Sequence, residues 1–212
     1  MNRLLTQEET LQFLEKALKE PKPGLKAQLT MVTDPRPGNK TINEVEGSCI
    51  KAGVLVLLYP WKGCLYLVLT RRTARMAFHQ AQISFAGGRQ EEGESFEQAA
   101  LREAEEELRI PPESIRILGG LTPLYIPPSN YCIYPAVAVA HERPDFRPSK
   151  HEVAEVIEVP LDHLLEPKNI LREVWTIQGV EVEVPFYFFD GHKIWGATAM
   201  VLAELTEILK QR

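Results

Sequence analysis

The sequence predicts one domain of mixed α and β structure, either an α+β fold or an α/β sandwich. Its 212 residues are 44% hydrophobic and 25% charged, a composition that can bury one sizeable core. Apolar runs rich in β-branched and aromatic residues are mixed with three helical patterns in an irregular order. That order favours a sandwich over a regularly alternating, doubly wound sheet.

A helix is expected near the amino terminus. Thr6 and Glu9 have the spacing of a capping box, apolar residues follow at roughly helical intervals, and Pro21 and Pro23 stop the pattern. Residues 21–48 are rich in Pro, Gly and charge, which predicts a long surface connection between this extra helix and the rest of the domain.

The apolar runs at residues 52–60 and 64–70 are separated by Trp-Lys-Gly, which predicts a β-hairpin of core strands. Residues 71–89 are polar and basic and are expected to form a loop. A helix is expected over 94–108, with Glu94 and Glu97 in its early turns, and a last helix over 196–212. Further strands are expected at residues 114–126, 132–140, 152–160 and 180–189.

The net charge and the cysteine content indicate which partners and which cellular compartment are expected. A net charge of −5 does not suggest a nucleic-acid surface. Three scattered cysteines without a C-x-x-C pair favour a reduced compartment, with the thiols as small buried hydrophobes. With neither a signal-peptide pattern nor a long apolar run, the sequence predicts a cytoplasmic protein without a membrane partner.

The stretch "REAEEEL", residues 102–108, crowds four glutamates into an expected helix. At about 100° per residue, Glu103, Glu106 and Glu107 share one sector of the helix, and like charges at these spacings repel. A solvated acidic face is one interpretation of this pattern. The other is a set of hard oxygen ligands for Mg²⁺ or Mn²⁺ that carries a substrate phosphate.

The segment around these glutamates resembles the Nudix box, G-x5-E-x7-R-E-U-x-E-E-x-G-U, in which U is aliphatic. The matching positions are Gly88, Glu94, Arg102, Glu103, Ala104, Glu106, Glu107 and Ile110. Two positions depart from the pattern: Ala104 is a small aliphatic residue, and Arg109 replaces the glycine that usually follows the helix.

This resemblance implies an α/β/α sandwich around a mixed sheet and an enzyme that hydrolyses a nucleoside diphosphate linked to another group. It implies that Glu103, Glu106 and Glu107 bind Mg²⁺ or Mn²⁺ and take part in catalysis. Glu94 and Arg102 would form a salt bridge that orients the loop, and the backbone at Gly87 and Gly88 would lie close to the metal. A non-catalytic nucleotide-binding module is the rival, although such modules usually lack one or more of the three carboxylates.

Residues 67–88 resemble a second signature, that of the coenzyme A pyrophosphatase branch, and residues 152–165 and 194–200 are also similar to this branch. The implied reaction cleaves coenzyme A or its thioesters to 4′-phosphopantetheine and adenosine 3′,5′-bisphosphate. Ala77 stands where that signature has an arginine, which leaves ADP-ribose, NADH and dinucleoside polyphosphates open as substrates.

A basic loop suits such a phosphorylated substrate, because charge-assisted donors bind phosphate strongly. The candidate phosphate-binding residues are Arg71, Arg72, Arg75, His79 and Arg89. For the general base, Glu155 is favoured over Glu152, and Glu103 or Glu106 acting through a metal-bound water is the alternative. The sequence leaves open whether the chain forms a homodimer.

Overall fold

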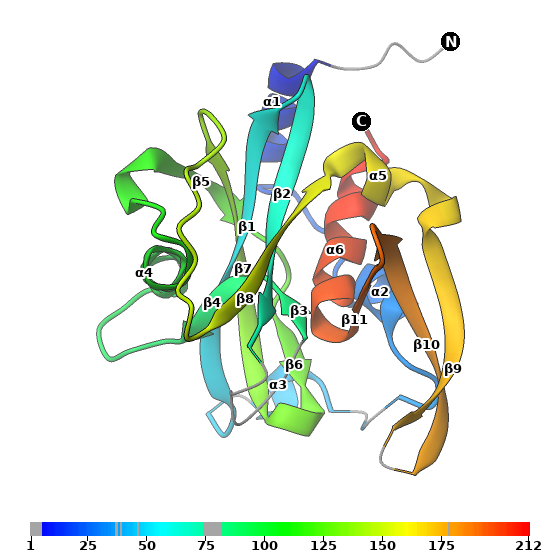
Figure 1. Ribbon diagram of the computed structural model, residues 1–212. Coiled ribbons are helices and arrows are strands. Elements are labelled where there is room, and N and C mark those ends of the chain that lie inside the picture. Colours follow the sequence, from blue (N-terminus) through cyan, green and yellow to red (C-terminus); the bar gives the residue numbers. More distant parts are fainter. Residues whose placement is uncertain (1–5, 37, 39, 46, 74–81, 178) are drawn as a thin grey trace.

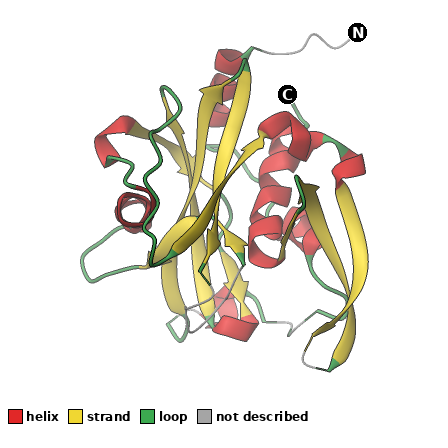
Figure 2. Ribbon diagram, in the orientation of Figure 1, coloured by secondary structure: helices red, strands yellow, loops and turns green. Residues whose placement is uncertain are grey.

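The computed structural model describes residues 6–36, 38, 40–45, 47–73, 82–177 and 179–212. A mixed sheet lies at the centre, with helix α4 (Phe96–Leu108) on one face and helix α6 (Gly196–Leu209) on the other (Figure 1). A second, smaller sheet lies beyond α6 (Figure 2). The predicted sandwich of helices around a mixed sheet is therefore confirmed.

The central sheet has eight strands in the order β3-β2-β1-β7-β5, with β4 paired to β1, β6 to β7 and β8 to β2. Strands β1 and β7 are parallel, and the other recorded pairs are antiparallel. The strands are β1 (Ile50–Trp61), β2 (Cys64–Arg72), β3 (Ile83–Ser84), β4 (Ala86–Arg89), β5 (Ile115–Gly120), β6 (Leu124–Ile126), β7 (Tyr131–Ala140) and β8 (Val153–Pro160).

The side chains of β1 alternate between two cores, as the strand period requires. Leu55 and Leu57 pack in the core beneath α4, whereas Val56 and Leu58 belong to the larger core that includes α6. The near-continuous apolar run in the sequence thus reflects a strand that is covered on both faces. The predicted β1–β2 hairpin is confirmed, and Lys62 and Gly63 turn it with positive φ values of 46° and 83°.

The smaller sheet has the order β11-β10-β9 and is antiparallel throughout. Its strands are β9 (Ile170–Ile177), β10 (Val180–Phe189) and β11 (His192–Trp195). Tyr187 and Ile194 place one face of this sheet in the core that contains α6. Only β10 was expected from the sequence.

The amino-terminal helix α1 (Gln7–Ala17) begins as predicted, with reciprocal hydrogen bonds between Thr6 and Glu9. The predicted surface connection after it is wrong in part, because Ala27, Gln28 and Met31 are buried. This segment forms short helices that pack on α6. The remaining helices are α2 (Leu25–Gln28), α3 (Ile42–Val45), α5 (Leu161–Leu165), η1 (Leu29–Met31), η2 (Pro112–Ser114), η3 (Pro127–Ser129) and η4 (Pro167–Asn169).

Two further expectations need correction. The described ends of the predicted loop 71–89 contain strands β3 and β4, which pair with β2 and β1. Cys49 and Cys132 are joined by a disulfide rather than being separate buried thiols, and Cys64 is free and half-buried. Cys132 alone of the three is fully buried.

Candidate active site

The candidate site forms where β4 passes beneath α4, and three glycines allow this close approach. Gly53 of β1 and Gly88 of β4 are cross-strand partners. A Cβ atom on Gly53 would lie 2.1 Å from the Phe96 carbonyl oxygen of α4, and one on Gly88 would lie 2.3 Å from Glu103 Oε1. A Cβ on Gly87 would meet the Gly53 carbonyl oxygen at 2.5 Å. Only glycine lets the helix, with its carboxylates, sit this close to the sheet.

Helix α4 starts two residues later than Glu94, the predicted start. Ser95 is the N-cap and exchanges hydrogen bonds with Gln98 in a capping box. Glu94 therefore lies in the preceding loop, where its carboxylate accepts a 3.0 Å hydrogen bond from the Glu91 N–H. The sequence predicted that Glu94 interacts with the positive end of the helix dipole. In the structure Glu94 instead contacts Arg102.

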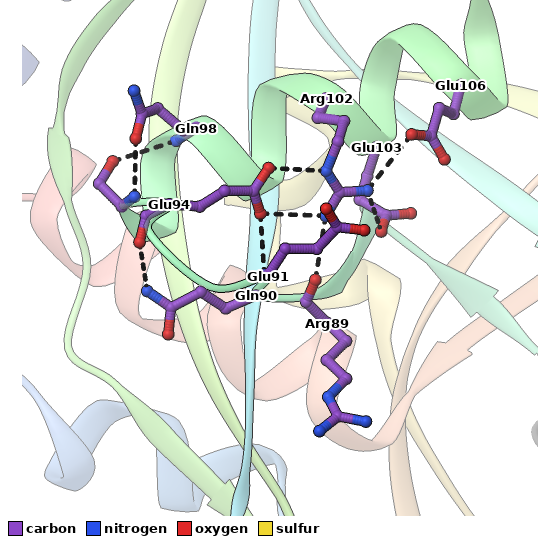
Figure 3. A network of polar contacts seen from close by, with 9 residues as sticks. Arg89, Gln90, Glu91, Glu94, Gln98, Arg102, Glu103 and Glu106 are labelled. Atoms are coloured by element: carbon purple, nitrogen blue, oxygen red, sulfur yellow. Dashed lines mark hydrogen bonds and ion pairs between the residues drawn. The ribbon is translucent and has the colours of Figure 1, made fainter.

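Arg102 is the centre of a polar network that joins this loop to α4 (Figure 3). Its Nε donates to Glu94 at 2.7 Å, and its Nη2 donates to the Arg89 carbonyl oxygen at 3.0 Å. Its Nη1 reaches Glu103 at 2.8 Å and Glu106 at 3.3 Å. The predicted Glu94–Arg102 pair is present, and the hydrogen bonds hold the pKa of Glu94 below its ordinary range.

Glu107 is the buried acid of the site, and Glu103 beside it is partly buried, with 16% of its side chain exposed. Burial raises the pKa of Glu107 to about 8; Arg72 opposes this shift, and the charges of Glu103 and Glu152 add to it. Burial also raises the pKa of Glu103, against the effect of Arg102. Glu106 is different, because 54% of its side chain is exposed. The carboxylates of Glu103 and Glu107 are thus poorly solvated, and the nearby arginines do not fully offset the cost of ionising them.

Glu152 is a fourth acid of this group, and the sequence interpretation ranked it below Glu155. Its charge raises the pKa of both Glu103 and Glu107. The segment that carries it is fixed to the end of α4 by a 2.8 Å hydrogen bond from the Ser149 N–H to the Glu107 carbonyl oxygen. The Thr73 N–H donates to the carbonyl oxygen of Glu152 at 2.9 Å.

The first two arginines of the basic segment have different surroundings. Arg72 Nη1 lies 4.0 Å from Glu107 Oε1, so this arginine reaches the buried carboxylates. Arg71 forms a 2.5 Å ion pair with Glu155, whose other oxygen lies 3.6 Å from His192 Nε2. The recorded contacts of Glu155 are therefore with β2 and β11, and none of them is with the glutamates of α4.

The structure shows no contact between the carboxylates and the side chains of the other candidates for phosphate binding that it describes. Arg75 and His79 lie outside the described residues. The backbone of Arg89 belongs to the Arg102 network, while its side chain extends away from the carboxylates (Figure 3).

The donor set suits a divalent cation. Carboxylate oxygens are the ligands that Mg²⁺ and Mn²⁺ prefer, and an added cation would favour the ionised form of Glu107, whose pKa is raised first by burial and then by the charges of Glu103 and Glu152. In the part of the chain that the structure describes, no three His, Cys, Asp or Glu side chains are already grouped as a metal site. Glu103 and Glu106 share Arg102 through one oxygen each, which leaves the second oxygen of each carboxylate for an ion.

The helix ends without the glycine that the Nudix pattern places there. Arg109 takes the left-handed conformation itself, with φ 59° and ψ 39°, and its N–H closes the last turn on the Glu105 carbonyl oxygen at 2.9 Å. The usual turn after the helix is therefore retained despite the substitution.

Comparison with known proteins identifies the family. The NUDIX domain model matches residues 50–176, more than half of the chain. Two bacterial relatives are both called uncharacterized Nudix hydrolase NudL. The one from Photorhabdus laumondii subsp. laumondii is 34% identical over 142 residues, 66% of this chain and 75% of the relative. The one from Pectobacterium atrosepticum is 35% identical over 152 residues, 69% of this chain and 76% of the relative.

Solved structures agree in fold. A Nudix hydrolase from M. smegmatis, RenU, superposes with a TM-score of 0.53 at 20% identity, covering 76% of this chain and 86% of that chain. The MutT protein from Methanosarcina mazei Go1 gives 0.50 at 17% identity, covering 77% and 96%. The chain belongs to the Nudix hydrolase family of pyrophosphohydrolases.

Proposed function

We propose that the chain hydrolyses the diphosphate linkage of coenzyme A or its thioesters with the help of Mg²⁺ or Mn²⁺. The products would be 4′-phosphopantetheine and adenosine 3′,5′-bisphosphate. The observation that carries the proposal is the pair of carboxylates, the buried Glu107 and the partly buried Glu103, next to the Gly87–Gly88 backbone. The coenzyme A branch is supported by the signature over residues 67–88, of which Arg72 reaches Glu107.

In the proposed reaction, water attacks one phosphorus atom of the diphosphate, the P–O bond to the bridging oxygen breaks, and two phosphate monoesters leave. A bound divalent ion would neutralise the diphosphate and lower the pKa of the attacking water. Glu103, Glu106 and Glu107 would hold the ion. Arg102 orients Glu103 and ties it to the loop through Glu94.

Arg72 is placed to bind a phosphate oxygen, because it already faces the carboxylates at the end of β2. Arg71, Arg75, His79 and Arg89 are proposed as further phosphate ligands. For Arg71 this role requires release from Glu155, with which it is paired.

Glu152 and Glu155 are proposed as candidates for the general base, beside Glu103 or Glu106 acting through a metal-bound water. The charge of Glu152 acts on Glu103 and Glu107, whereas Glu155 is held by Arg71 and His192, so the contacts favour Glu152. Replacing each by Gln separates them. Loss of kcat in Glu152→Gln with little change in Glu155→Gln supports Glu152, and the reverse result assigns the base to Glu155.

The deciding experiment measures hydrolysis of coenzyme A, acetyl-CoA, ADP-ribose, NADH and diadenosine tetraphosphate with Mg²⁺, with Mn²⁺ and with EDTA. The products are identified by mass. Metal-dependent release of 4′-phosphopantetheine at the highest kcat/KM of the panel is expected. If coenzyme A is the poorest substrate, the branch assignment is wrong, and if no substrate is cleaved, a non-catalytic binding module takes its place.

Glu103→Gln and Glu106→Gln are expected to lower kcat by something on the order of 10²–10³, as the loss of one group that stabilises the transition state does. Glu105→Gln is the matched control, because Glu105 is an exposed acid of the same helix turn that lies outside the acidic sector. Equal activity of all three variants under saturating Mg²⁺ would contradict the assigned roles.

The proposed location is the cytoplasm. None of the helices in the described ranges is both long and apolar enough to cross a membrane. The disulfide between Cys49 and Cys132 runs against this location, because cytosolic thiols are kept reduced, so the redox state of the two cysteines in cells reports the compartment. Alkylation of both thiols in rapidly quenched cells supports the cytoplasm, and complete protection of both points to an oxidising compartment.

A further inference from the structure

Exposed apolar side chains gather on the small sheet. Within the described ranges, the large hydrophobic residues that are exposed are Leu171, Val174, Val180 and Phe188, all on β9 or β10. Val174 is the most exposed of them, at 66%. Leu171, Val180 and Phe188 lie on one face of this sheet and Val174 on the other, so the exposed apolar side chains flank β9 and β10 on both faces.

Strand β9 is also an open edge of its sheet, since it pairs with β10 on one side only in the part of the chain that the structure describes. Residues 171–174 are all exposed, and the pairing with β10 continues without a register shift from Ile170 to Ile177. The strand has neither proline nor glycine. It therefore presents a row of backbone donors and acceptors that is ready to pair with another strand.

Features that usually protect an edge are present elsewhere in the molecule but not here. The edge strand β5 has a register shift between Ile117 and Gly119, and β11 is only four residues long. The charges of β9 are turned to partners in their own sheet: Arg172 pairs with Glu183 at 2.7 Å, and Glu173 with Lys193 at 2.5 Å. These ion pairs partly neutralise the charges, although the side chains of Arg172 and Glu173 remain 52% and 43% exposed.

The sequence of β9 suits pairing with a second copy of itself. A two-fold axis perpendicular to the sheet leaves each face of the sheet on the same side in both copies. Residues that are opposite each other across the new edge must then point to the same face, so their numbers are both odd or both even. This condition is met only when the axis passes through a residue position. Axes at positions 173 and 174 align the longest part of the strand, residues 170–176 and 171–177 respectively. An axis at 173 places Glu173 opposite Glu173 of the other copy, which is repulsive.

An axis at Val174 avoids like charges. It aligns residues 171–177 of the two copies, with Val174 opposite Val174, Arg172 opposite Thr176, and Leu171 opposite Ile177. The existing pairs Trp195–Phe186, Phe186–Leu171 and Ile177–Val180 would then join into one apolar row across both sheets. The exposed side chain of Leu171 would gain a cross-strand neighbour, Ile177 of the other copy.

We propose that the chain forms a two-fold symmetric dimer in which the β9 edges pair antiparallel about Val174, so that the two small sheets form one six-stranded sheet. The interface is isologous and closes on itself, so it yields a dimer rather than a filament. The glutamates of α4 are on the helix at the opposite face of the central sheet from α6, against which the small sheet packs.

A cysteine scan along β9 tests both the interface and its register. In a Cys64→Ser background, Arg172, Glu173, Val174 and Thr176 are changed singly to Cys, and the protein is oxidised mildly. Val174→Cys is expected to form a disulfide-linked dimer, because its two copies face each other. Thr176→Cys is the matched control on the same face, since its two copies would be about 14 Å apart along the strands, beyond disulfide reach.

Sedimentation equilibrium supplies the second measurement. The wild-type protein is expected to be a dimer and Val174→Lys a monomer, with unchanged thermal unfolding of the isolated chain and unchanged kcat. Ser114→Lys adds the same charge at an exposed site on η2 and is expected to remain a dimer. A monomeric wild type, a dimeric Val174→Lys, or cross-linking of Thr176→Cys as strong as that of Val174→Cys would each overturn the proposal.

Discussion

Glu107 shows how one side chain can serve function at the expense of stability. Its ordinary pKa is 4.5, and burial raises the pKa to about 8 in the folded chain. Below pH 4.5 the carboxyl is protonated in both the folded and the unfolded chain, so its ionisation has no effect. Between pH 4.5 and about 8 the unfolded chain releases a proton that the folded chain keeps, and the free energy of unfolding falls.

In the presence of EDTA, Glu107→Gln is therefore expected to be more stable than wild type at pH 8.5, by something on the order of a few kcal/mol, and to lose this advantage near pH 4.5. Urea unfolding at several pH values measures the difference. Glu105→Gln, at an exposed position of the same helix, is the comparison variant. Stability curves of wild type and Glu107→Gln that stay parallel across this range would refute the prediction.

Arg109 carries a cost of a different kind. A non-glycine residue in the left-handed conformation is disfavoured by about 1–2 kcal/mol, and Arg109 adopts that conformation at the end of α4. Arg109→Gly is expected to raise the free energy of unfolding by about 1 kcal/mol after the greater freedom of glycine in the unfolded chain is subtracted. Arg109→Ala removes the same side chain without relieving the backbone, so it should show no gain. Chemical denaturation of both variants decides the matter.

At the scale of elements, the site depends on how closely α4 approaches the sheet. At Gly53 an added methyl group would meet backbone, the Phe96 carbonyl oxygen at 2.1 Å, whereas at Gly88 it would meet the mobile end of the Glu103 side chain. The first clash can be relieved only by moving the helix. The second can be relieved by turning one carboxylate.

Gly53→Ala is therefore expected to cost stability, by about 1–3 kcal/mol or more, as overpacking does. Gly88→Ala should cost less stability but lose most activity, because Glu103 is displaced. Gly120→Ala is the control: its added Cβ would lie 3.5 Å from the Pro135 carbonyl oxygen, an ordinary contact, in a strand of the same sheet. The thermal unfolding temperature and kcat are measured for all three variants. Similar decreases of both quantities in every variant would contradict the expectation that Gly53→Ala affects mainly stability and Gly88→Ala mainly activity.

Elements with strong local signals were predictable from the sequence. The capping box of α1, the Lys62–Gly63 turn and the spacing of the glutamates on α4 all depend on residues close in the chain. Strand β9 was missed because its exposed face also carries apolar residues, and β11 because it is too short for a pattern. The position of Glu152 depends on a non-local contact, the Ser149 hydrogen bond to α4, which no local pattern reveals.

At the scale of the whole molecule, Glu204 joins parts of the chain that lie outside and inside the family match. It is fully buried on α6 and accepts hydrogen bonds from the Gly24 N–H at 3.1 Å and the Gln28 amide at 2.9 Å. The Thr122 N–H and hydroxyl donate to it at 3.0 Å and 2.6 Å. One carboxylate thereby fastens the amino-terminal segment and the β5–β6 connection to the carboxyl-terminal helix.

Glu204→Gln keeps the shape but replaces one acceptor oxygen with an NH₂ group, which then faces donors in a buried place. The variant is expected to lose about 1–3 kcal/mol of stability, the cost of an unsatisfied buried polar group, and to expose residues 21–31 to proteolysis before the central sheet unfolds. Glu207→Gln, one turn later on α6 and half exposed, should behave like wild type. Limited trypsin digestion followed by mass measurement checks the order of cleavage, since Lys26 lies in that segment and is followed by alanine, whereas the Lys22–Pro23 bond resists trypsin. If cleavage at Lys26 is no faster in Glu204→Gln than in Glu207→Gln, the amino-terminal segment is held by its apolar contacts with α6 and not by this carboxylate.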